Sequence, residues 1–181
     1  MRGRTVQAKT VTLCAVLTAL ALGLSYAERL LPLGLAVPLP GVKLGLANVV
    51  TLAALYLLGP RTALTVLVLR CLLGAVFGGG VTALAFSLTG GLLALAAMAA
   101  ARHAPFLSVY GVSILGAAAH NVGQILAAMA VLRSVYVAAY LPFLLLVSAA
   151  TGLLTGAASA GTLRALAAAA HSEKRPGGMK S

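Results

Sequence analysis

The chain has 181 residues, of which 61% are hydrophobic and 8% are charged, and its mean hydropathy is +1.07. Soluble domains carry about a quarter charged residues, so this composition excludes an ordinary soluble domain and predicts an integral membrane protein. The 13 Lys and Arg residues give a formal net charge of +11. They are scattered singly between apolar runs, a distribution that sets membrane topology and argues against nucleic-acid binding.

The amino terminus allows two interpretations. Basic residues precede the apolar run Val11–Leu24, and Ser25-Tyr26-Ala27 follows it, which is also the layout of a secretory signal peptide with a small-residue cleavage site. The apolar stretch continues to Leu31, however, and further apolar segments follow. We therefore favour a first transmembrane helix that is retained.

Six apolar segments predict six transmembrane helices. They cover Thr10–Leu31, Leu46–Gly59, Thr62–Phe77, Val81–Ala101, Val109–Leu132 and Leu141–Leu163. The expected fold is all-α and polytopic. Residues 1–9 form a basic cytoplasmic amino terminus, residues 10–166 a single six-helix transmembrane domain, and residues 167–181 a disordered cytoplasmic tail.

The second segment is the shortest, and the polar stretch Pro40–Asn48 leads into it. As a helix it is about 20 Å long, whereas the hydrocarbon core of a bilayer is about 30 Å thick. Irregular backbone at membrane depth is tolerated where it lines a cavity. We therefore expect a re-entrant loop between the first two helices, with Lys43 and Asn48 facing such a cavity.

The basic residues also set the orientation. With the amino terminus in the cytoplasm, only Arg29, Lys43 and Arg133 lie outside, and Arg70 lies within the membrane. The remaining basic residues fall on the cytoplasmic side: Arg2, Arg4, Lys9, Arg61, Arg102, Arg164, Lys174, Arg175 and Lys180. The prediction is a multi-pass protein of the bacterial cytoplasmic membrane with both termini inside.

Two predicted helices carry small residues at four-residue spacing, which lets membrane helices approach closely. The stripe on the first helix consists of Ala15, Ala19, Gly23 and Ala27, and that on the sixth of Ser148, Gly152, Gly156 and Ala160. Each stripe serves either internal packing or the docking of another subunit. The candidate docking residues are Ala15, Ala19 and Gly23.

Ionisable residues inside a membrane are costly and are candidates for function. Arg70 lies nine residues beyond Arg61, about 13 Å into the bilayer. It forms a structural ion pair or binds helix-end carbonyl groups, or it contacts an anionic or polar substrate in a wet cavity. Glu28 lies at the outer end of the first segment, where it either pairs with a neighbouring base or acts on a proton or a substrate amine.

Three hydrogen-bonding side chains lie near the middle of the fifth segment: His120, Asn121 and Gln124. His120 and Gln124 are four residues apart and share a helix face, with Asn121 on its edge. We favour a cavity-lining role, and a cluster of hydrogen bonds between helices is the alternative. The weaker candidates for the same lining are Ser25, Tyr26, Tyr56, Ser87 and Thr89.

Motifs for catalysis and cofactors are missing from the sequence. The chain has two acidic residues, both Glu, whereas prenyl-diphosphate chemistry needs Mg²⁺ held by clustered carboxylates. There is no GxxxxGK[ST] motif for ATP. Cys14 and Cys71 lack the spacing of a disulfide framework or a metal site. We therefore expect no enzymatic activity, no cofactor and no metal.

Three stretches of the chain resemble a known family. They are PGVKLGLANVVTLAALYLLG (Pro40–Gly59), LRCLLGAVFGG (Leu69–Gly79) and GVSILGAAAHNVGQIL (Gly111–Leu126). On these residues the chain is identified as a member of the Gx transporter family, whose members are commonly labelled heptaprenyl diphosphate synthase component I. That family is grouped with the substrate-binding S components of energy-coupling factor (ECF) transporters.

The resemblance implies a vitamin-like ligand bound near the outer face, beneath a lid formed by Leu33–Gly45. The residues that it implies around the ligand are Lys43, Asn48, Arg70, His120, Asn121 and Gln124. It also implies that the surface around Ala15 and Ala19 docks a transmembrane coupling subunit, which works with ATPases.

The expected function is therefore that of a substrate-binding membrane subunit of a transporter. It would take up a small, anionic, vitamin-like, isoprenoid or cofactor-like ligand from outside, because positive groups dominate around the predicted cavity. One alternative is an accessory subunit of a membrane redox or prenyl-lipid (quinone) complex that transports nothing. Another is an ion-coupled carrier that acts alone through Glu28 or His120.

Overall fold

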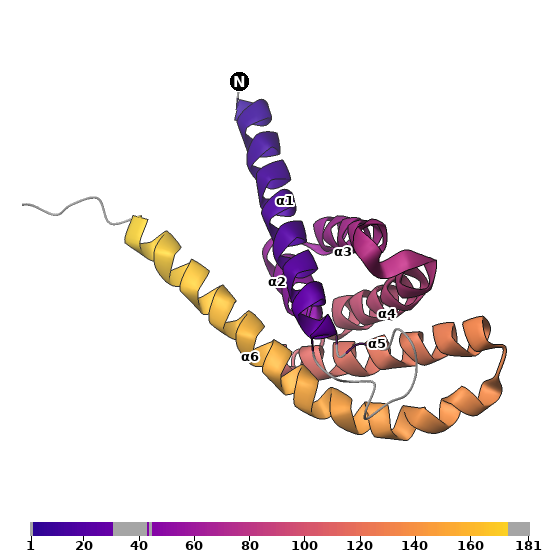
Figure 1. Ribbon diagram of the computed structural model, residues 1–181. Coiled ribbons are helices and arrows are strands. Elements are labelled where there is room, and N and C mark those ends of the chain that lie inside the picture. The colour runs from indigo at the N-terminus through magenta and orange to yellow at the C-terminus, as the bar shows by residue number, and fades with distance from the viewer. Residues whose placement is uncertain (1, 31–42, 44, 174–181) are drawn as a thin grey trace, which may run out of the picture.

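A computed structural model describes residues 2–30, 43 and 45–173, and the described chain is helical, with no β-strand among these residues (Figure 1). The helices are α1 (Arg2–Arg29), α2 (Asn48–Leu57), α3 (Pro60–Gly74), α4 (Gly80–Ala101), α5 (Val109–Leu132) and α6 (Leu141–Glu173). A wide helical turn, η2 (Ala75–Gly79), joins α3 to α4, and a 3-10 helix, η3 (Val135–Tyr140), precedes α6.

The all-α prediction is confirmed for the described part of the chain, and each of the six predicted apolar segments contains a helix. Four stretches are long and apolar enough to cross a membrane: Thr10–Glu28, Pro60–Ala101, Val109–Leu132 and Val135–Ala165. Helix α2 is apolar but shorter. The chain is thus membrane-like in its helices, while six crossings remain a prediction. The expected re-entrant lid lies outside the described residues, except for Lys43 and Gly45.

The stretch Pro60–Ala101 contains a reversal of chain direction. Pro60 begins α3 directly after Gly59, the placement in which proline suits a helix start. After α3 the backbone leaves helical geometry at Phe77 and Gly78, and both Gly78 (φ 105°) and Gly80 (φ 67°) adopt positive φ, which glycine tolerates best. The chain folds back here, so that α3 and α4 pack side by side as a hairpin (Figure 1).

Helix α5 has the bounds predicted from the sequence, Val109–Leu132, and the Ser108 side chain caps its start by accepting from the Gly111 N–H at 3.4 Å. Helix α6 corrects a prediction. It continues to Glu173, although a disordered tail was expected from residue 167. The sequence there is rich in alanine, the residue with the highest helix propensity. The remainder of that tail, residues 174–181, lies outside the described residues.

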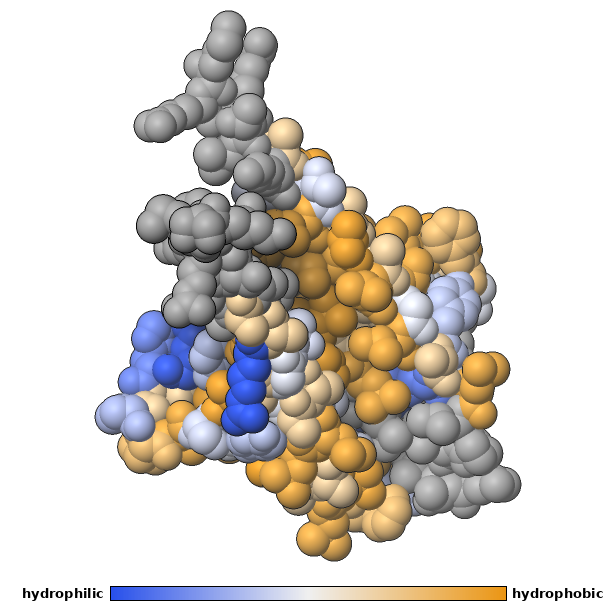
Figure 2. All heavy atoms as spheres, turned by 90° about the vertical axis from the view of Figure 1, so that its left-hand side faces the viewer, coloured by the Kyte–Doolittle hydropathy of each residue, from blue (hydrophilic) through white to orange (hydrophobic). Residues whose placement is uncertain are grey.

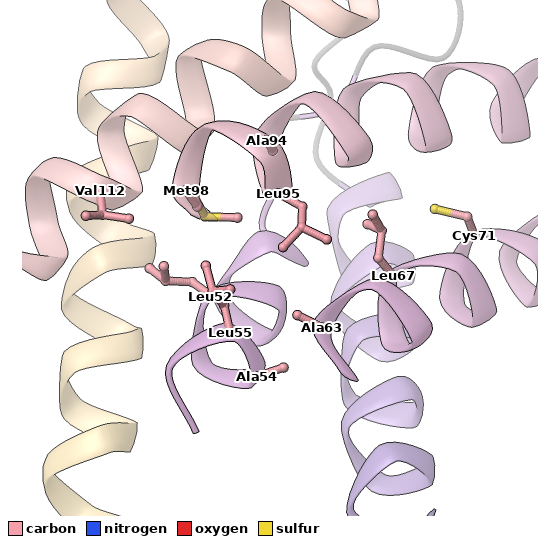
Figure 3. Close-up of a cluster of buried hydrophobic side chains, with 10 residues drawn as sticks. All are labelled: Leu52, Ala54, Leu55, Ala63, Leu67, Cys71, Ala94, Leu95, Met98 and Val112. Carbon is pink, nitrogen blue, oxygen red and sulfur yellow. The ribbon is translucent and has the colours of Figure 1, made fainter. Parts of the chain in front are cut away.

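The main hydrophobic core lies where α2, α3, α4 and α5 meet (Figure 3). Its members are Leu52, Ala54 and Leu55 of α2, Ala63, Leu67 and Cys71 of α3, Ala94, Leu95 and Met98 of α4, and Val112 of α5. The short helix α2 is thereby held inside the bundle. Its burial places the residues that precede it among the membrane-length helices.

Figure 2 shows a face of the molecule on which hydrophobic side chains form a broad surface. Large apolar side chains are exposed on several helices, for example Val11 (65%), Leu146 (75%) and Leu154 (67%). Contiguous apolar surface of this kind marks a membrane or protein interaction site. Together with the lengths of the helices, it indicates association with a lipid bilayer.

Candidate functional site

Helices α4 and α5 cross with their backbones in close contact. A Cβ atom on Gly123 would lie 2.7 Å from the Cα atom of Gly90, closer than side chains allow. Small residues at such a crossing permit tight helix packing in a membrane. His120, one turn before Gly123, is thereby pressed against α4, and a Cβ atom on Gly90 would lie 2.9 Å from its ring.

A chain of hydrogen bonds runs from Lys43 into α5. The Lys43 backbone N–H donates to Gln124 Oε1 at 3.1 Å, and Gln124 Nε2 lies 3.0 Å from His120 Nε2. Because a backbone N–H can only donate, the amide oxygen of Gln124 must face Lys43 and its NH₂ group must face the imidazole. His120 Nε2 therefore accepts, which leaves the ring proton on Nδ1 and the ring neutral in this arrangement.

Glu28, near the end of α1, forms a hydrogen bond with the residues that directly precede α2. Its Oε1 accepts from the Gly45 backbone N–H at 2.6 Å, and the side chain is 2% exposed. Gly45 has φ 80°, and a Cβ atom there would meet Asn48 at 2.9 Å and His120 at 3.0 Å. The position therefore requires glycine both for its backbone angle and for space.

Arg70 of α3 is 6% exposed and reaches toward α1, where its Nη1 donates to Ser25 Oγ at 3.3 Å. Its Nε and Nη2 have no hydrogen-bond partner among the residues that the structure describes. Glu28 is near enough to interact electrostatically with both Arg70 and Lys43. Two positive charges and one negative charge thus meet within the membrane-length helices.

A small cavity lies between these charged groups and α4. Its walls are Ser25, Lys43, Arg70, Cys71, Gly74, Ala75, Ala83 and Ser87. The Lys43 Nζ donates to Ser87 Oγ at 3.1 Å across it. With a volume of about 10 Å³, the cavity has room for about one water-sized group.

Asn48 is the first residue of α2 and lies beside Gly45 and His120. It is 6% exposed, and neither Nδ2 nor Oδ1 of its amide has a hydrogen-bond partner in the described ranges. Buried amides in proteins are normally hydrogen-bonded. A bound molecule could therefore form hydrogen bonds with the amide of Asn48 and with Nε and Nη2 of Arg70, which lack partners among the described residues.

Asn121 lies apart from the other predicted site residues. Its Nδ2 donates to the Leu144 carbonyl at 2.9 Å and to Ser148 Oγ at 2.8 Å, both on α6. Successive helix positions are about 100° apart, so Asn121 faces α6 while His120 faces α4. The structure thus brings together Glu28, Lys43, Asn48, Arg70, His120 and Gln124, and it places Asn121 in the interface between α5 and α6.

Some contributors carried little or no signal in the sequence. Cys71 is a member of the main hydrophobic core and also lines the cavity. The backbone N–H groups of Lys43 and Gly45 bind side chains of the cluster, and no sequence pattern reveals backbone donors. Of the weaker candidates, Ser25 and Ser87 line the cavity, whereas Tyr26, Tyr56 and Thr89 are not among its walls.

A family model described as heptaprenyl diphosphate synthase component I matches residues 17–162, which is most of the chain. The chain belongs to this family. The family predicted from the sequence is confirmed, whereas the relation to ECF S components remains a prediction. No curated protein sequence matched the chain, and no solved structure matched it.

The family description names a component of a synthase, so the site must be compared with that chemistry. Within residues 2–30, 43 and 45–173, no group of three or more His, Cys, Asp or Glu side chains lies together as a metal site would require. The polar cluster described above consists mainly of basic and amide side chains. Clustered carboxylates are the ligands that hold Mg²⁺ against a diphosphate, and Glu28 is the one carboxylate among the described side chains of the cluster.

The predicted docking residues of α1 lie on an open face. Ala15, Ala19 and Gly23 are exposed, and a Cβ atom on Gly23 would meet nothing within 4 Å. A shallow groove runs along this face, lined by Val16, Ala19, Leu20, Gly23, Leu24 and Ala27. This surface of α1 is unused by the described part of the chain.

Proposed function

We propose that this protein is the substrate-binding membrane subunit of a transporter, similar in role to an ECF S component. It crosses the membrane six times through α1–α6, with both termini in the cytoplasm. A small anionic ligand, of vitamin, isoprenoid or cofactor type, enters from the outer face and binds near Lys43. The single observation that supports this best is the buried polar cluster with unpaired groups on Arg70 and Asn48.

Several features of the cluster favour ligand binding over a purely structural role. Polar groups buried at membrane depth are costly when unpaired, and a protein that needed only stability would pair or omit them. The cluster also joins four separate segments through Glu28, Lys43, Arg70 and Gln124. A ligand that bridges such segments can couple its own binding to their relative movement.

The proposed docking partner is a transmembrane coupling subunit that works with ATPases. The exposed small residues Ala15, Ala19 and Gly23 on α1 support this assignment, since small residues let a second membrane helix approach closely. The chain itself has no ATP-binding motif. Energy for release of the ligand would therefore come from the partner.

A second candidate function follows from the family description. In this alternative the protein is a non-catalytic membrane subunit of a prenyl-lipid or redox complex and transports nothing. It would not itself be the catalytic subunit, because the sequence offers only two glutamates for binding Mg²⁺.

One purification distinguishes these functions. The full chain is purified in mild detergent, its solvent extract is analysed by mass spectrometry for small molecules, and copurifying subunits are identified. Transport binding predicts a small anionic molecule that is lost from Arg70→Ala and Lys43→Ala but retained by Arg61→Ala, an exposed control on α3. A prenyl synthase or redox subunit recovered in stoichiometric amount, with no small molecule, would favour the alternative.

A further inference from the structure

The free edge of Arg70 has a specific shape. In a guanidinium group, Nη1 lies on one side and the N–H bonds of Nε and Nη2 point in parallel on the other. Ser25 occupies Nη1, whereas Nε and Nη2 are without a hydrogen-bond partner in the described part of the chain. Two parallel donors of this kind match the two oxygens of a carboxylate or a phosphate.

Glu28 interacts electrostatically with Arg70 but makes no hydrogen bond to the free edge in the described part of the chain. Glu28 holds the Gly45 backbone N–H through Oε1 at 2.6 Å. Arg70 lines the cavity with Lys43, Cys71 and Ser87. A molecule in the cavity could therefore supply an acceptor to the free edge, and Lys43 lines the same cavity.

The charges around the cavity restrict the charge that a bound molecule carries. We take Lys43 and Arg70 as positive and Glu28, which accepts from the Gly45 N–H beside these two cations, as negative. With His120 neutral in its hydrogen-bond arrangement, these described side chains sum to +1. An uncompensated charge is expensive at membrane depth. A group with one negative charge would neutralise the cluster, whereas a diphosphate would leave it negative.

We propose that the ligand binds to Arg70 through a carboxylate, with its two oxygens accepting from Nε and Nη2. This inference rests on the proposed function and narrows its substrate class to carboxylates, as distinct from the prenyl diphosphates that the family description suggests. Lys43 leaves Ser87 on binding, because the cavity of about 10 Å³ does not hold a carboxylate beside the present Lys43 side chain.

Cys71 provides a direct test, because it lines the same cavity and is 4% exposed. The full chain with Cys14→Ser, which leaves Cys71 as its only thiol, is placed in phosphatidylcholine nanodiscs. The rate at which neutral N-ethylmaleimide modifies Cys71 is then measured with acetate, butyrate, inorganic phosphate or pyrophosphate at matched ionic strength. Bound carboxylate should slow the reaction by 1 + [L]/Kd, about fivefold at four times Kd.

Variants of Arg70 distinguish the effect of its two parallel N–H donors from the effect of its positive charge. Arg70→Lys keeps the positive charge but removes the paired donors, and it should weaken protection by carboxylates about tenfold in Kd. Arg61→Lys, on the exposed start of the same helix, should leave protection unchanged. Should Arg70→Lys fail to fold, the order of protection in the protein with Arg70 intact still tests the proposal, since acetate and butyrate should protect Cys71 better than inorganic phosphate and pyrophosphate.

The outcomes are decisive in both directions. Protection by acetate or butyrate that depends on Arg70 and exceeds the protection by inorganic phosphate and pyrophosphate would support the proposal. Equal or stronger protection by pyrophosphate, protection by added phosphatidylglycerol in place of carboxylates, or full protection in Arg70→Lys would overturn it. A copurifying solute without a carboxylate would overturn the proposal that the ligand is a carboxylate but would remain consistent with the transport function. The absence of any solute would contradict the proposed function as well.

Discussion

The two stripes of small residues have the same spacing and opposite surroundings. On α6, Gly152 and Gly156 are buried, and a Cβ atom on Gly152 would lie 2.5 Å from the Ile114 Cα atom of α5. On α1, a Cβ atom on Gly23 would meet nothing within 4 Å. The four-residue repeat thus encodes the ability to approach another helix. Whether that helix belongs to the same chain depends on the rest of the fold.

The small-residue stripe on α6 should be the more sensitive of the two to larger side chains. Gly152→Val would force a branched side chain into the Ile114 backbone, which cannot move as a side chain can. We expect the free energy of unfolding to fall by about 3 kcal/mol, as for overpacked cores. The measurement is an SDS titration in mixed micelles followed by circular dichroism. Gly161→Val is the matched control on the same helix, since nothing lies within 4 Å of a Cβ atom there. Equal losses in the two variants would contradict the packing described.

A smaller effect should follow at the polar contact beside that stripe. Asn121→Ala removes the hydrogen bonds to Leu144 and Ser148, and membrane hydrogen bonds contribute about 0.6 kcal/mol each. We expect a loss of about 1 kcal/mol in the same titration, with unchanged ligand content. If Asn121→Ala instead removed a copurifying ligand without lowering stability, Asn121 would belong to the binding site and its assignment to the α5–α6 interface would be wrong.

The stripe on α1 should be the least sensitive in the isolated protein. Gly23→Leu should change the free energy of unfolding by less than about 0.5 kcal/mol, as surface substitutions do. The same variant should reduce the recovery of a copurifying membrane partner, because a large side chain keeps a second helix away. Leu20→Ala, beside Gly23 in the groove, is the control for general loss of apolar surface. Marked destabilisation by Gly23→Leu would show that the stripe packs within the chain.

Much of the fold is readable from the sequence because apolar length and helix stop signals are local. Ser108 and Arg133 bracket α5, and the glycines at 78 and 80 mark the reversal between α3 and α4. Helix α6 extends beyond Leu163, the predicted end of the sixth segment, because the alanines that follow favour helix. The two stripes show what local sequence does not predict. They have the same four-residue spacing of small residues, yet one is buried and the other is exposed.

The candidate site was readable in part from the sequence. The family resemblance implied that Lys43, Arg70 and Gln124 surround one ligand, and the structure brings these residues together. The orientation of Asn121 depended on which helix packs on which side of α5, which is a tertiary property. The roles of the Gly45 N–H and Cys71 also required the three-dimensional arrangement, because both groups are ordinary in the sequence.

The central claim is that the buried cluster binds a small anion. Native mass spectrometry of the intact protein, released gently from detergent, tests it most directly. The account predicts a mass addition by one small molecule on the wild-type chain and on Arg61→Ala, and the bare protein mass for Arg70→Ala. The bare mass for all three proteins, when they are prepared from cells without any ligand-removing step, would contradict it.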